Sequence, residues 1–382
     1  MGPIYLDHAA TTPLAPEARA AMAPFLTEEF GNPSSRHAVG VRAARALEEA
    51  RRHVARLTGA TPDDVVFTSG GTEANNLAVL GLARAQARHG RHVLVGPTEH
   101  PCVRDAARAL VEEGFEVETL SLDARGGLDL EQARARLRAD TVLVAQMLVN
   151  NEFGTIYPLA RLARLVRASA PHARLHVDAV QAAGKLELSL GELGAHSLAV
   201  SAHKFRGPKG AGALALAPGV RPRPLLFGGA QERGLRSGTE NVAGIVGLGV
   251  AAELAERGLA RAQAHFAERR AQLRAALARV EGAELLEPGG SEGVAPAICS
   301  LLLPGPPAEA WQHHLEAREL YVSVGSACQA KKGGVSPALL ALGLDERRAK
   351  SVLRLSFGRE TSAAEVDAAV DALGAVAREL RA

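Results

Sequence analysis

The stretch Val65-Val-Phe-Thr-Ser-Gly-Gly-Thr-Glu73 begins as a short apolar run and continues through a glycine-rich turn into the helical sequence Ala74–Arg84. Glycines let the backbone approach a ligand closely, and the amides at a helix start attract an anion. With the amide of Gly71 and the hydroxyl of Thr72, the turn is suited to hold a phosphate group. The alternative is an ordinary tight connection between a strand and a helix, and this stretch alone leaves both open.

The same order of strand and helix continues along the chain from about residue 60 to 216. Helical stretches such as Leu77–Arg88 and Leu159–Ser169 separate the short apolar runs. These runs are Val65–Phe67, His92–Val95, Val117–Leu120, Thr141–Gln146, Arg174–Asp178, Leu198–Ser201 and Ala211–Leu216. The alternation predicts an α/β fold with a mainly parallel seven-stranded sheet.

The last third of the chain has a different pattern. From Val242 to about Val280, a segment rich in Ala, Arg and Glu predicts one or two helices. Shorter strands are expected at Ala297–Leu303, Leu320–Val324 and Val352–Phe357. We therefore expect a second, smaller α+β domain.

The composition excludes several classes of protein. With 382 residues, of which 47% are hydrophobic and 23% charged, the chain has neither a disordered nor a collagen-like composition. Its longest uncharged apolar run, Val242–Ala252, is too short for a membrane span, and Met1–Ala10 does not resemble a signal peptide. The net charge of +2 is spread without a basic block. We therefore expect a cytoplasmic protein that binds neither membranes nor nucleic acid.

The three cysteines are too few and too scattered for a disulfide framework, and no metal site is expected. Cys299 lies in an apolar run and fits an inert, buried thiol. Cys328 lies in a glycine-rich loop beside Lys331 and Lys332, which favour its thiolate form, so it is a candidate nucleophile. Cys102 is ambiguous between packing and function.

Lysine is rare, since only six of the 44 basic Lys and Arg side chains are lysines. A lysine in an apolar context is therefore a candidate for chemistry that needs a primary amine, such as Schiff-base formation. Lys350 and Lys209 look exposed. Lys204 instead ends the buried run Leu198–His203, and ligands bind at the carboxyl ends of strands in open α/β sheets.

Two strand ends and the glycine-rich turn together indicate pyridoxal phosphate (PLP). The motif His176-Val-Asp-Ala-Val-Gln181 places Asp178 at one strand end, and Ser201-Ala-His-Lys204 places a lysine 26 residues later at another. This cofactor needs an amine for its Schiff base, a carboxylate for its pyridine nitrogen and a site for its phosphate. ATP and nicotinamide cofactors lose support, because the chain has neither a Walker A sequence nor a dinucleotide-binding turn.

Two further residues leave alternatives open. His100 follows a strand and precedes a proline, so it is either a helix-start residue or part of a site. Arg354 lies between apolar neighbours in a strand and needs an anion, either a substrate carboxylate or an acidic side chain of the other domain. His89 and His92 look exposed and receive no role.

Several motifs, taken together in their order, closely resemble the NifS/IscS-type cysteine desulfurases over about residues 4–375. They are Tyr5-Leu-Asp-His-Ala-Ala-Thr-Thr12, Gly31-Asn-Pro-Ser-Ser35, Thr68–Glu73, Val149-Asn-Asn-Glu152, Val177-Asp178, Ser201-Ala-His-Lys204, Glu232-Arg-Gly-Leu-Arg-Ser-Gly-Thr239, Gly325-Ser-Ala-Cys328 and Arg354-Leu-Ser-Phe-Gly358. The resemblance implies a homodimer of PLP fold type I. Residues 16–258 would form the large PLP-binding domain, and residues 1–15 with 259–382 the small domain.

The resemblance also implies the activity and the residues that perform it. The enzyme would remove sulfur from L-cysteine, giving L-alanine and a persulfide on Cys328. Lys204 would form the Schiff base and move protons, Asp178 would pair with the pyridine nitrogen, and Gln181 would contact the ring hydroxyl. His100 would stack on the ring at the catalytic centre.

The remaining implied roles concern the phosphate and the substrate. The phosphate would be held by Gly71, Thr72, Ser201, His203 and, from the second subunit, Thr239. Asn151 would contact cofactor and substrate, and Arg354 would bind the substrate carboxylate.

The sulfur is expected to pass to an acceptor protein, either an iron–sulfur scaffold or a carrier for tRNA or cofactor thiolation. The chain ends at Ala382 without the longer tail with which IscS-like members dock a scaffold, and Gln329-Ala-Lys-Lys332 replaces the small residues usual after the cysteine. We therefore expect acceptor choice to differ. The alternatives are a selenocysteine lyase or another class-V aminotransferase, and a non-catalytic sulfur-transfer scaffold.

Overall fold

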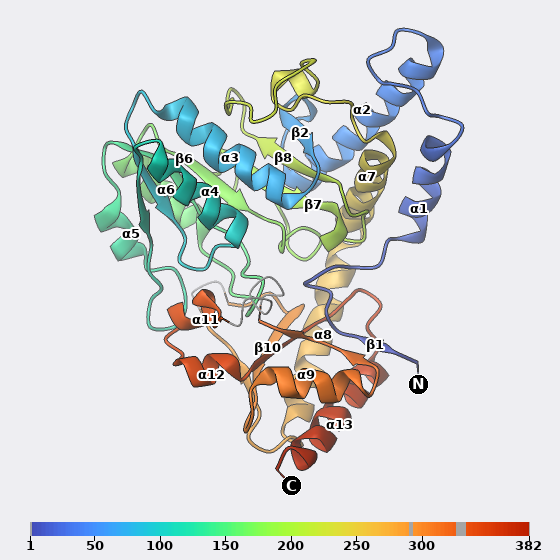
Figure 1. Cartoon of the computed structure of the whole chain (residues 1–382), viewed down its shortest axis with the longest axis vertical. Helices are drawn as coiled ribbons and strands as arrows, with labels where there is room; N and C mark the ends of the chain where they lie inside the picture. The colour runs from blue at the N-terminus through green and yellow to red at the C-terminus, as the bar shows by residue number, and fades with distance from the viewer. Residues whose placement is uncertain (1, 290–292, 326–333, 382) are drawn as a thin grey trace.

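The computed structural model describes residues 2–289, 293–325 and 334–381, which form two parts drawn one above the other in Figure 1. The upper part contains a seven-stranded sheet and the lower part a four-stranded sheet. Both ends of the chain lie in the lower part. Within the described ranges, no helix has the length and apolar character needed to cross a membrane.

The large sheet contains all seven predicted strands. Across the sheet they are β2 (Val65–Thr68), β8 (Gly212–Leu216), β7 (Ser197–Ser201), β6 (Arg174–Asp178), β5 (Thr141–Ala145), β3 (His92–Val95) and β4 (Glu116–Thr119). The five strands from β7 to β4 are parallel, whereas β8 runs antiparallel to both of its neighbours. The prediction of an α/β fold with a mainly parallel seven-stranded sheet is confirmed.

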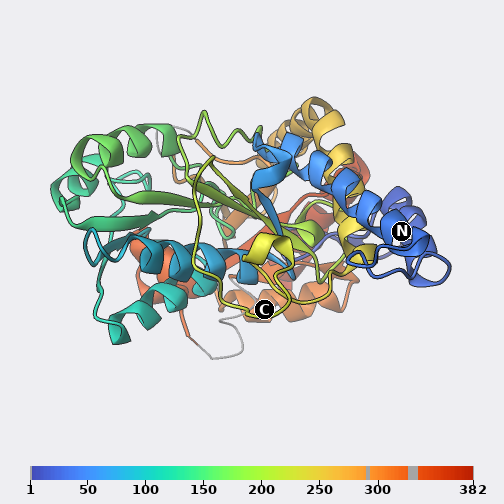
Figure 2. The same ribbon diagram turned by 90° about the horizontal axis from the view of Figure 1, so that it is seen from above.

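Helices cover both faces of this sheet (Figure 2). One face packs against α2 (Ala38–Thr58), α6 (Leu159–Ser169) and α7 (Val242–Arg257), and the other against α3 (Gly71–Gln86) and α4 (Pro101–Glu112). Strands covered on both faces are apolar along their whole length, which explains the continuous apolar runs of the sequence. The smaller elements are α1 (Pro16–Met22), η1 (Ala23–Leu26), η2 (Pro62–Asp64), α5 (Leu130–Arg136), η3 (Ala202–Lys204) and η4 (Glu232–Gly234).

The small sheet is antiparallel and has its own core. Its order is β12 (Ser323–Val324), β13 (Val352–Ser356), β10 (Ile298–Leu302) and β9 (Glu284–Leu286). The other elements of this part are α8 (Leu259–Leu277), α9 (Ala308–Glu316), α11 (Pro337–Ala341), α12 (Glu346–Lys350) and α13 (Ala363–Glu379). The core formed by α8, α9, α13 and the sheet is separate from those of the large sheet and contains Trp311 and Phe266.

The first residues of the chain pack against its last third. β1 (Ile4–Tyr5) pairs in parallel with β11 (Leu320–Tyr321), and Asp7 forms a bridge with Ser356 at the end of β13. This pairing brings the N-terminal segment to the junction of the two sheets. The domain boundaries after residues 15 and 258 remain a prediction.

The structure corrects three local expectations. α3 begins at Gly71 instead of Ala74, because Gly70 adopts a φ of 153° that turns the chain sharply from β2 into the helix. His92 is fully buried, not exposed, because it begins β3 between two other strands, where its ring bonds Thr141 Oγ1 at 2.8 Å. β1 and β9 were not predicted, since two or three residues are too few to show a periodic pattern.

Candidate active site

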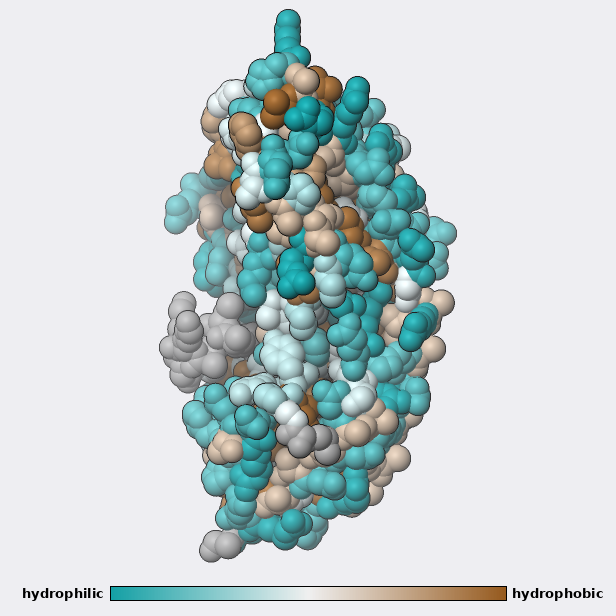
Figure 3. Space-filling view, turned by 90° about the vertical axis from the view of Figure 1, so that its right-hand side faces the viewer, coloured by the Kyte–Doolittle hydropathy of each residue, from teal (hydrophilic) through white to brown (hydrophobic). Residues whose placement is uncertain are grey.

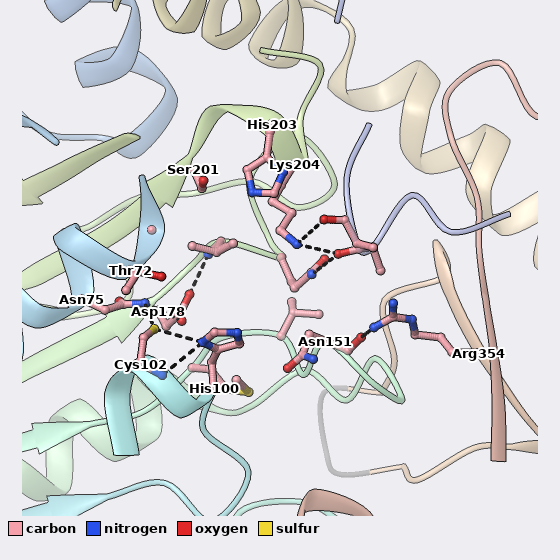
Figure 4. A pocket seen from close by; sticks show the side chains of 17 residues that line it. Thr72, Asn75, His100, Cys102, Asn151, Asp178, Ser201, His203, Lys204 and Arg354 are labelled. Atoms are coloured by element: carbon pink, nitrogen blue, oxygen red, sulfur yellow. Dashed lines mark hydrogen bonds between the residues drawn. The ribbon is translucent and has the colours of Figure 1, made fainter. Parts of the chain in front are cut away.

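A cavity of about 320 Å³ lies where the carboxyl ends of the parallel strands meet the N-terminal segment and β13. Its lining includes most of the predicted site residues: Gly71, Thr72, His100, Asn151, Asp178, Gln181, Ser201, His203, Lys204 and Arg354. Figure 4 shows their side chains converging from β6, β7, α3, α4 and β13. The sequence argument, that strand ends gather functional side chains, is thus supported by the geometry.

Lys204 enters the cavity from η3, directly after β7. Its Nζ donates hydrogen bonds to the carbonyl oxygens of Ala9 and Ala10, each at 2.8 Å (Figure 4). Both carbonyls belong to the N-terminal segment. The segment that packs against the small sheet therefore also directs the amine of the large part.

Asp178 lies at the opposite side of the cavity, at the end of β6, and is buried. One carboxylate oxygen accepts the Val180 N–H at 2.9 Å, and the other accepts Nδ2 of Asn75 at 2.8 Å. Burial raises the pKa of Asp178 above its ordinary value, and these hydrogen bonds and the charge of Lys204 offset only part of that rise. A buried carboxylate held in this way is suited to face a cationic ring nitrogen.

The predicted phosphate turn is tightly enclosed. A Cβ on Gly71 would lie only 2.8 Å from Cγ2 of Val180, and the same position lies 3.4 Å from Cβ of Ser201. Thr72 lies at the first turn of α3, where the helix amides are unpaired within the helix, and its side chain lines the cavity. Glycine at position 71 thus lets the start of α3 pack closely against Val180 and Ser201, with its free amides beside the cavity.

His100 caps the N-terminus of α4, where its Nδ1 accepts the backbone N–H of Cys102 at 3.2 Å. Burial, together with the charge of Lys204, lowers its pKa, so the ring is neutral near pH 7. His203 is also neutral, since burial lowers its pKa to about 4, and its Nδ1 lies 3.1 Å from Oγ1 of Thr11. Both imidazoles line the cavity.

Arg354 has an acidic partner, Asp7, in the N-terminal segment that was expected to belong to the same small domain, and its role toward a substrate carboxylate stays a prediction. Its Nη2 forms a 2.8 Å ion pair with Asp7, and its Nη1 donates to the carbonyl oxygen of Asn151 at 2.7 Å. Its Nε is buried and has no hydrogen-bond partner within the described part of the chain. The guanidinium is therefore anchored at the cavity wall by the N-terminal segment and by the loop that follows β5.

Two predicted residues are not brought to this cavity by the described chain. Thr239 is exposed in the loop after η4 and does not line it. Cys328 lies outside the described residues, as do Lys331 and Lys332.

The structure adds residues to which the sequence argument gave no role. Asn75 lines the cavity one helical turn after Gly71, a spacing that could have revealed it. Cys102, left ambiguous, also lines the cavity, and burial raises the pKa of its thiol to about 12. Lys185 is buried behind Lys204, with its Nζ 3.5 Å from Oε1 of Gln181.

Comparison with known proteins agrees with this geometry. Residues 4–369 match the model of the aminotransferase class-V family. The chain belongs to this family. Among curated class-V relatives, it is 38% identical to "Cysteine desulfurase IscS 1" of Archaeoglobus fulgidus, covering 99% of this chain and 97% of the relative. It is 42% identical to "Cysteine desulfurase IscS" of Methylococcus capsulatus, covering 96% and 91%.

Solved class-V structures show the same fold. A structure titled as a NifS-like protein superposes with a TM-score of 0.92 at 35% identity, covering 99% of this chain and all of that one. Another, titled as SspA in complex with cysteine, gives a TM-score of 0.80 at 32% identity, covering 94% and 100%. The recognised resemblance to NifS/IscS-type proteins is thus confirmed, and class-V enzymes are in general PLP-dependent.

Proposed function

We propose that the protein is a PLP-dependent L-cysteine desulfurase that forms L-alanine and a persulfide on Cys328. One structural observation carries the proposal: a single cavity holds a lysine amine, a buried carboxylate and a glycine-walled helix start. The relatives match nearly the full length of this chain and are named cysteine desulfurases, which supports the choice of substrate.

The residues present fit the cofactor. Lys204 would hold it as a Schiff base, Asp178 would face its pyridine nitrogen, and Gln181 would reach its ring hydroxyl. Gly71, Thr72, Ser201 and His203 would surround its phosphate, and His100 would lie against the ring. When bound, PLP supplies an electron sink for charge that develops on the substrate carbon.

The substrate side of the cavity is formed by Arg354 and Asn151. Arg354 lines the cavity and would bind the α-carboxylate of cysteine, and its ion pair with Asp7 keeps the guanidinium in one orientation. The Lys204 amine lines the cavity and would be the base that moves the proton of the substrate's Cα. These groups bind, orient and deprotonate; none of them removes sulfur.

Sulfur removal is assigned to Cys328. Its thiolate would attack the substrate Sγ, forming a sulfur–sulfur bond while the substrate's Cβ–Sγ bond breaks. The electron pair of that bond goes to Cβ, which takes a proton and becomes the methyl group of alanine. The persulfide sulfur would then pass to an acceptor protein for iron–sulfur assembly or thiolation, as the IscS names of the relatives suggest.

We propose that the protein acts as a homodimer with Thr239 completing the phosphate site of the other subunit. Three large apolar side chains, Leu26, Phe30 and Phe227, are 68%, 77% and 83% exposed in the single chain, which supports their burial by a second subunit. In Figure 3 apolar side chains gather on the upper half of the face shown, whereas the lower half is mostly hydrophilic. Large exposed apolar areas are typical of interfaces.

The decisive variant is Cys328→Ser, with Cys299→Ser as the matched control because Cys299 is buried in the small sheet. After one turnover with ³⁵S-cysteine, wild-type protein and the control are expected to carry labelled sulfur and to release one alanine. Cys328→Ser is expected to keep the cofactor absorption but carry no label. Label and alanine at the control level in Cys328→Ser would overturn the proposal. Selenide release by Cys328→Ser from selenocysteine, supplied in a parallel assay, would favour a selenocysteine lyase.

A further inference from the structure

A continuous chain of hydrogen bonds runs behind the cavity and ends at His100. Ser197 Oγ and His176 Nδ1 lie 2.8 Å apart, and His176 Nε2 lies 2.9 Å from Asn75 Oδ1. Asn75 Nδ2 reaches Cys102 Sγ at 3.3 Å, besides its bond to Asp178, and Cys102 Sγ lies 3.0 Å from His100 Nδ1 (Figure 4). The chain thus links β7, β6, α3 and α4.

The direction of every bond follows from one backbone group. The N–H of Cys102 can only donate, so His100 Nδ1, which accepts it, carries no proton. At 3.0 Å from this unprotonated nitrogen, the Cys102 thiol donates its S–H to Nδ1, so the two donors share one lone pair. Because its proton is used there, Sγ can only accept from Asn75, so the amide nitrogen of Asn75 faces it.

The remaining protons follow in the same way. With its nitrogen directed at Cys102 and Asp178, Asn75 presents Oδ1 to His176, which must therefore be protonated at Nε2. His176 Nδ1 then accepts the hydroxyl proton of Ser197. This assignment agrees with burial, which lowers the pKa of His176 to about 3 and keeps the ring neutral.

We propose that Cys102 is a positioning residue that fixes His100 as the tautomer protonated only at Nε2. A neutral imidazole with Nδ1 unprotonated carries its proton on the other nitrogen. In Figure 4 that second nitrogen lies on the cavity side of the ring, away from Cys102. The edge of His100 that faces a bound molecule therefore donates a hydrogen bond and does not accept one.

The environment of His100 supports a stable neutral state. The cations Lys204, from η3, and Arg104, on α4, lower its pKa together with burial. Asp178, on β6, and Asp105, on α4, raise it. The thiol keeps its own proton, since burial and the charge of Asp178 raise the pKa of Cys102 to about 12. The catalytic meaning of this tautomer rests on the proposed function, whereas the tautomer itself does not.

The test is the pair of ¹⁵N chemical shifts of His100 in the cofactor-bound protein, recorded from pH 5 to 8. His100→Gln identifies the signals by their loss. In the wild type, Nε2 is expected to be protonated and Nδ1 unprotonated at pH 7. In Cys102→Ala one donor to Nδ1 is lost, so the pKa of His100 is expected to rise by roughly half to one pH unit.

Two variants separate positioning from packing. Cys102→Ser keeps a donor at the same atom and is expected to restore the wild-type titration. Cys299→Ala, a change at a buried thiol outside the cavity, is expected to leave it unchanged. In Cys102→Ala the acidic limb of the plot of kcat/KM against pH is expected to move to higher pH by the same amount as the pKa of His100.

The proposal is overturned if wild-type His100 is protonated at Nδ1, or if Cys102→Ala titrates like Cys299→Ala. If Cys102→Ala does not fold, the proposal is still tested by the ¹⁵N shifts of wild-type His100 and by the His100 titration in Cys102→Ser. A protein that shows the expected shifts but produces no sulfide from cysteine would refute the proposed function and leave this inference standing.

Discussion

Single buried residues around the cavity have protonation states set mainly by loss of water. Lys185 is the sharpest example, because burial and the nearby cations Lys204 and Arg359 lower its pKa to about 7. No role was assigned to Lys185 from the sequence, since a lysine seven residues after a strand gives no sign of being enclosed. Cys102 was equally hard to assign, because its contacts join elements that are distant in sequence.

Replacing Lys185 by Met is expected to stabilise the protein, and more at pH 7 than at pH 10. Between pH 7 and the ordinary lysine pKa of 10.5, the unfolded Lys185 holds a proton that the folded one lacks. The stability of the wild type therefore rises with pH, and the stability difference between the variant and the wild type becomes smaller toward pH 10.5. The pKa shift sets an upper bound of roughly 4 to 5 kcal/mol near pH 7. The measurement is the thermal midpoint at both pH values.

Lys350→Met is the control for this experiment, since Lys350 is exposed. It is expected to change the midpoint little at either pH. A Lys185→Met protein whose midpoint relative to wild type does not depend on pH would contradict a buried amine with a lowered pKa.

Arg354→Lys tests the carboxylate site. Lysine keeps the charge but lacks the planar fork and its Nε–H, so KM for L-cysteine is expected to rise on the order of tenfold or more, with a smaller change in kcat. Alanine formation at varied cysteine concentration measures both. Asp7→Asn weakens the ion pair but keeps the fork. Equal increases in KM for the two variants would show that Arg354 acts only through the ion pair.

At the scale of elements, the turn between β2 and α3 depends on its contact with β8. A Cβ on Gly212 would lie 2.6 Å from Cα of Gly70 and 2.8 Å from the carbonyl oxygen of Val200. Gly70 has a φ of 153°, a conformation that favours glycine and that the sharp turn from β2 into α3 requires, so its backbone has little freedom to shift away from a new side chain. The strand, the turn and the helix were predicted from the sequence. The contact between this turn and β8 could not be predicted, because it depends on the order of the strands in the sheet.

Gly212→Ala is therefore expected to displace the turn and weaken PLP binding by roughly tenfold, the scale of an overpacked contact. Titration of the apoprotein with PLP, followed by absorbance, measures the affinity. Gly191→Ala is the matched control, because its Cβ would meet nothing within 4 Å. Wild-type affinity in Gly212→Ala would contradict the role given to this turn.

The whole molecule places the site where segments far apart in sequence meet. Parallel strands bring Asp178 and Lys204 to one edge, and this much followed from the order of apolar runs. The contacts that could not be predicted from the pattern of apolar runs are those of the N-terminal segment, because a strand of two residues is too short to indicate that β1 pairs with β11. That pairing is what carries Ala9 and Ala10 to Lys204 and Asp7 to Arg354.

A dimer with shared sites predicts complementation between two defective subunits. A purified mixed dimer of Lys204→Ala and Thr239→Val subunits contains one site with a native lysine and a native threonine from the other chain. It is expected to show about half the wild-type rate, because one of two sites is complete. Cysteine-dependent alanine formation measures it.

The control dimer carries the same two substitutions in the opposite arrangement. A subunit with both Lys204→Ala and Thr239→Val is paired with a wild-type subunit, whose site then receives valine. Its rate is expected to fall to about half that of the Thr239→Val homodimer, because only one of its two sites keeps Lys204. A control dimer faster than the complementing dimer would place Thr239 in the site of its own chain.

The central claim is tested most directly by one spectrum and one stoichiometry. Purified protein is mixed with L-cysteine under a reductant while the visible absorption, alanine and sulfide are recorded in the same sample. A PLP-dependent cysteine desulfurase is expected to show a yellow cofactor band that shifts when cysteine is added, followed by alanine and sulfide in equal amounts. No cofactor band, or a band that shifts without releasing sulfide, would contradict it.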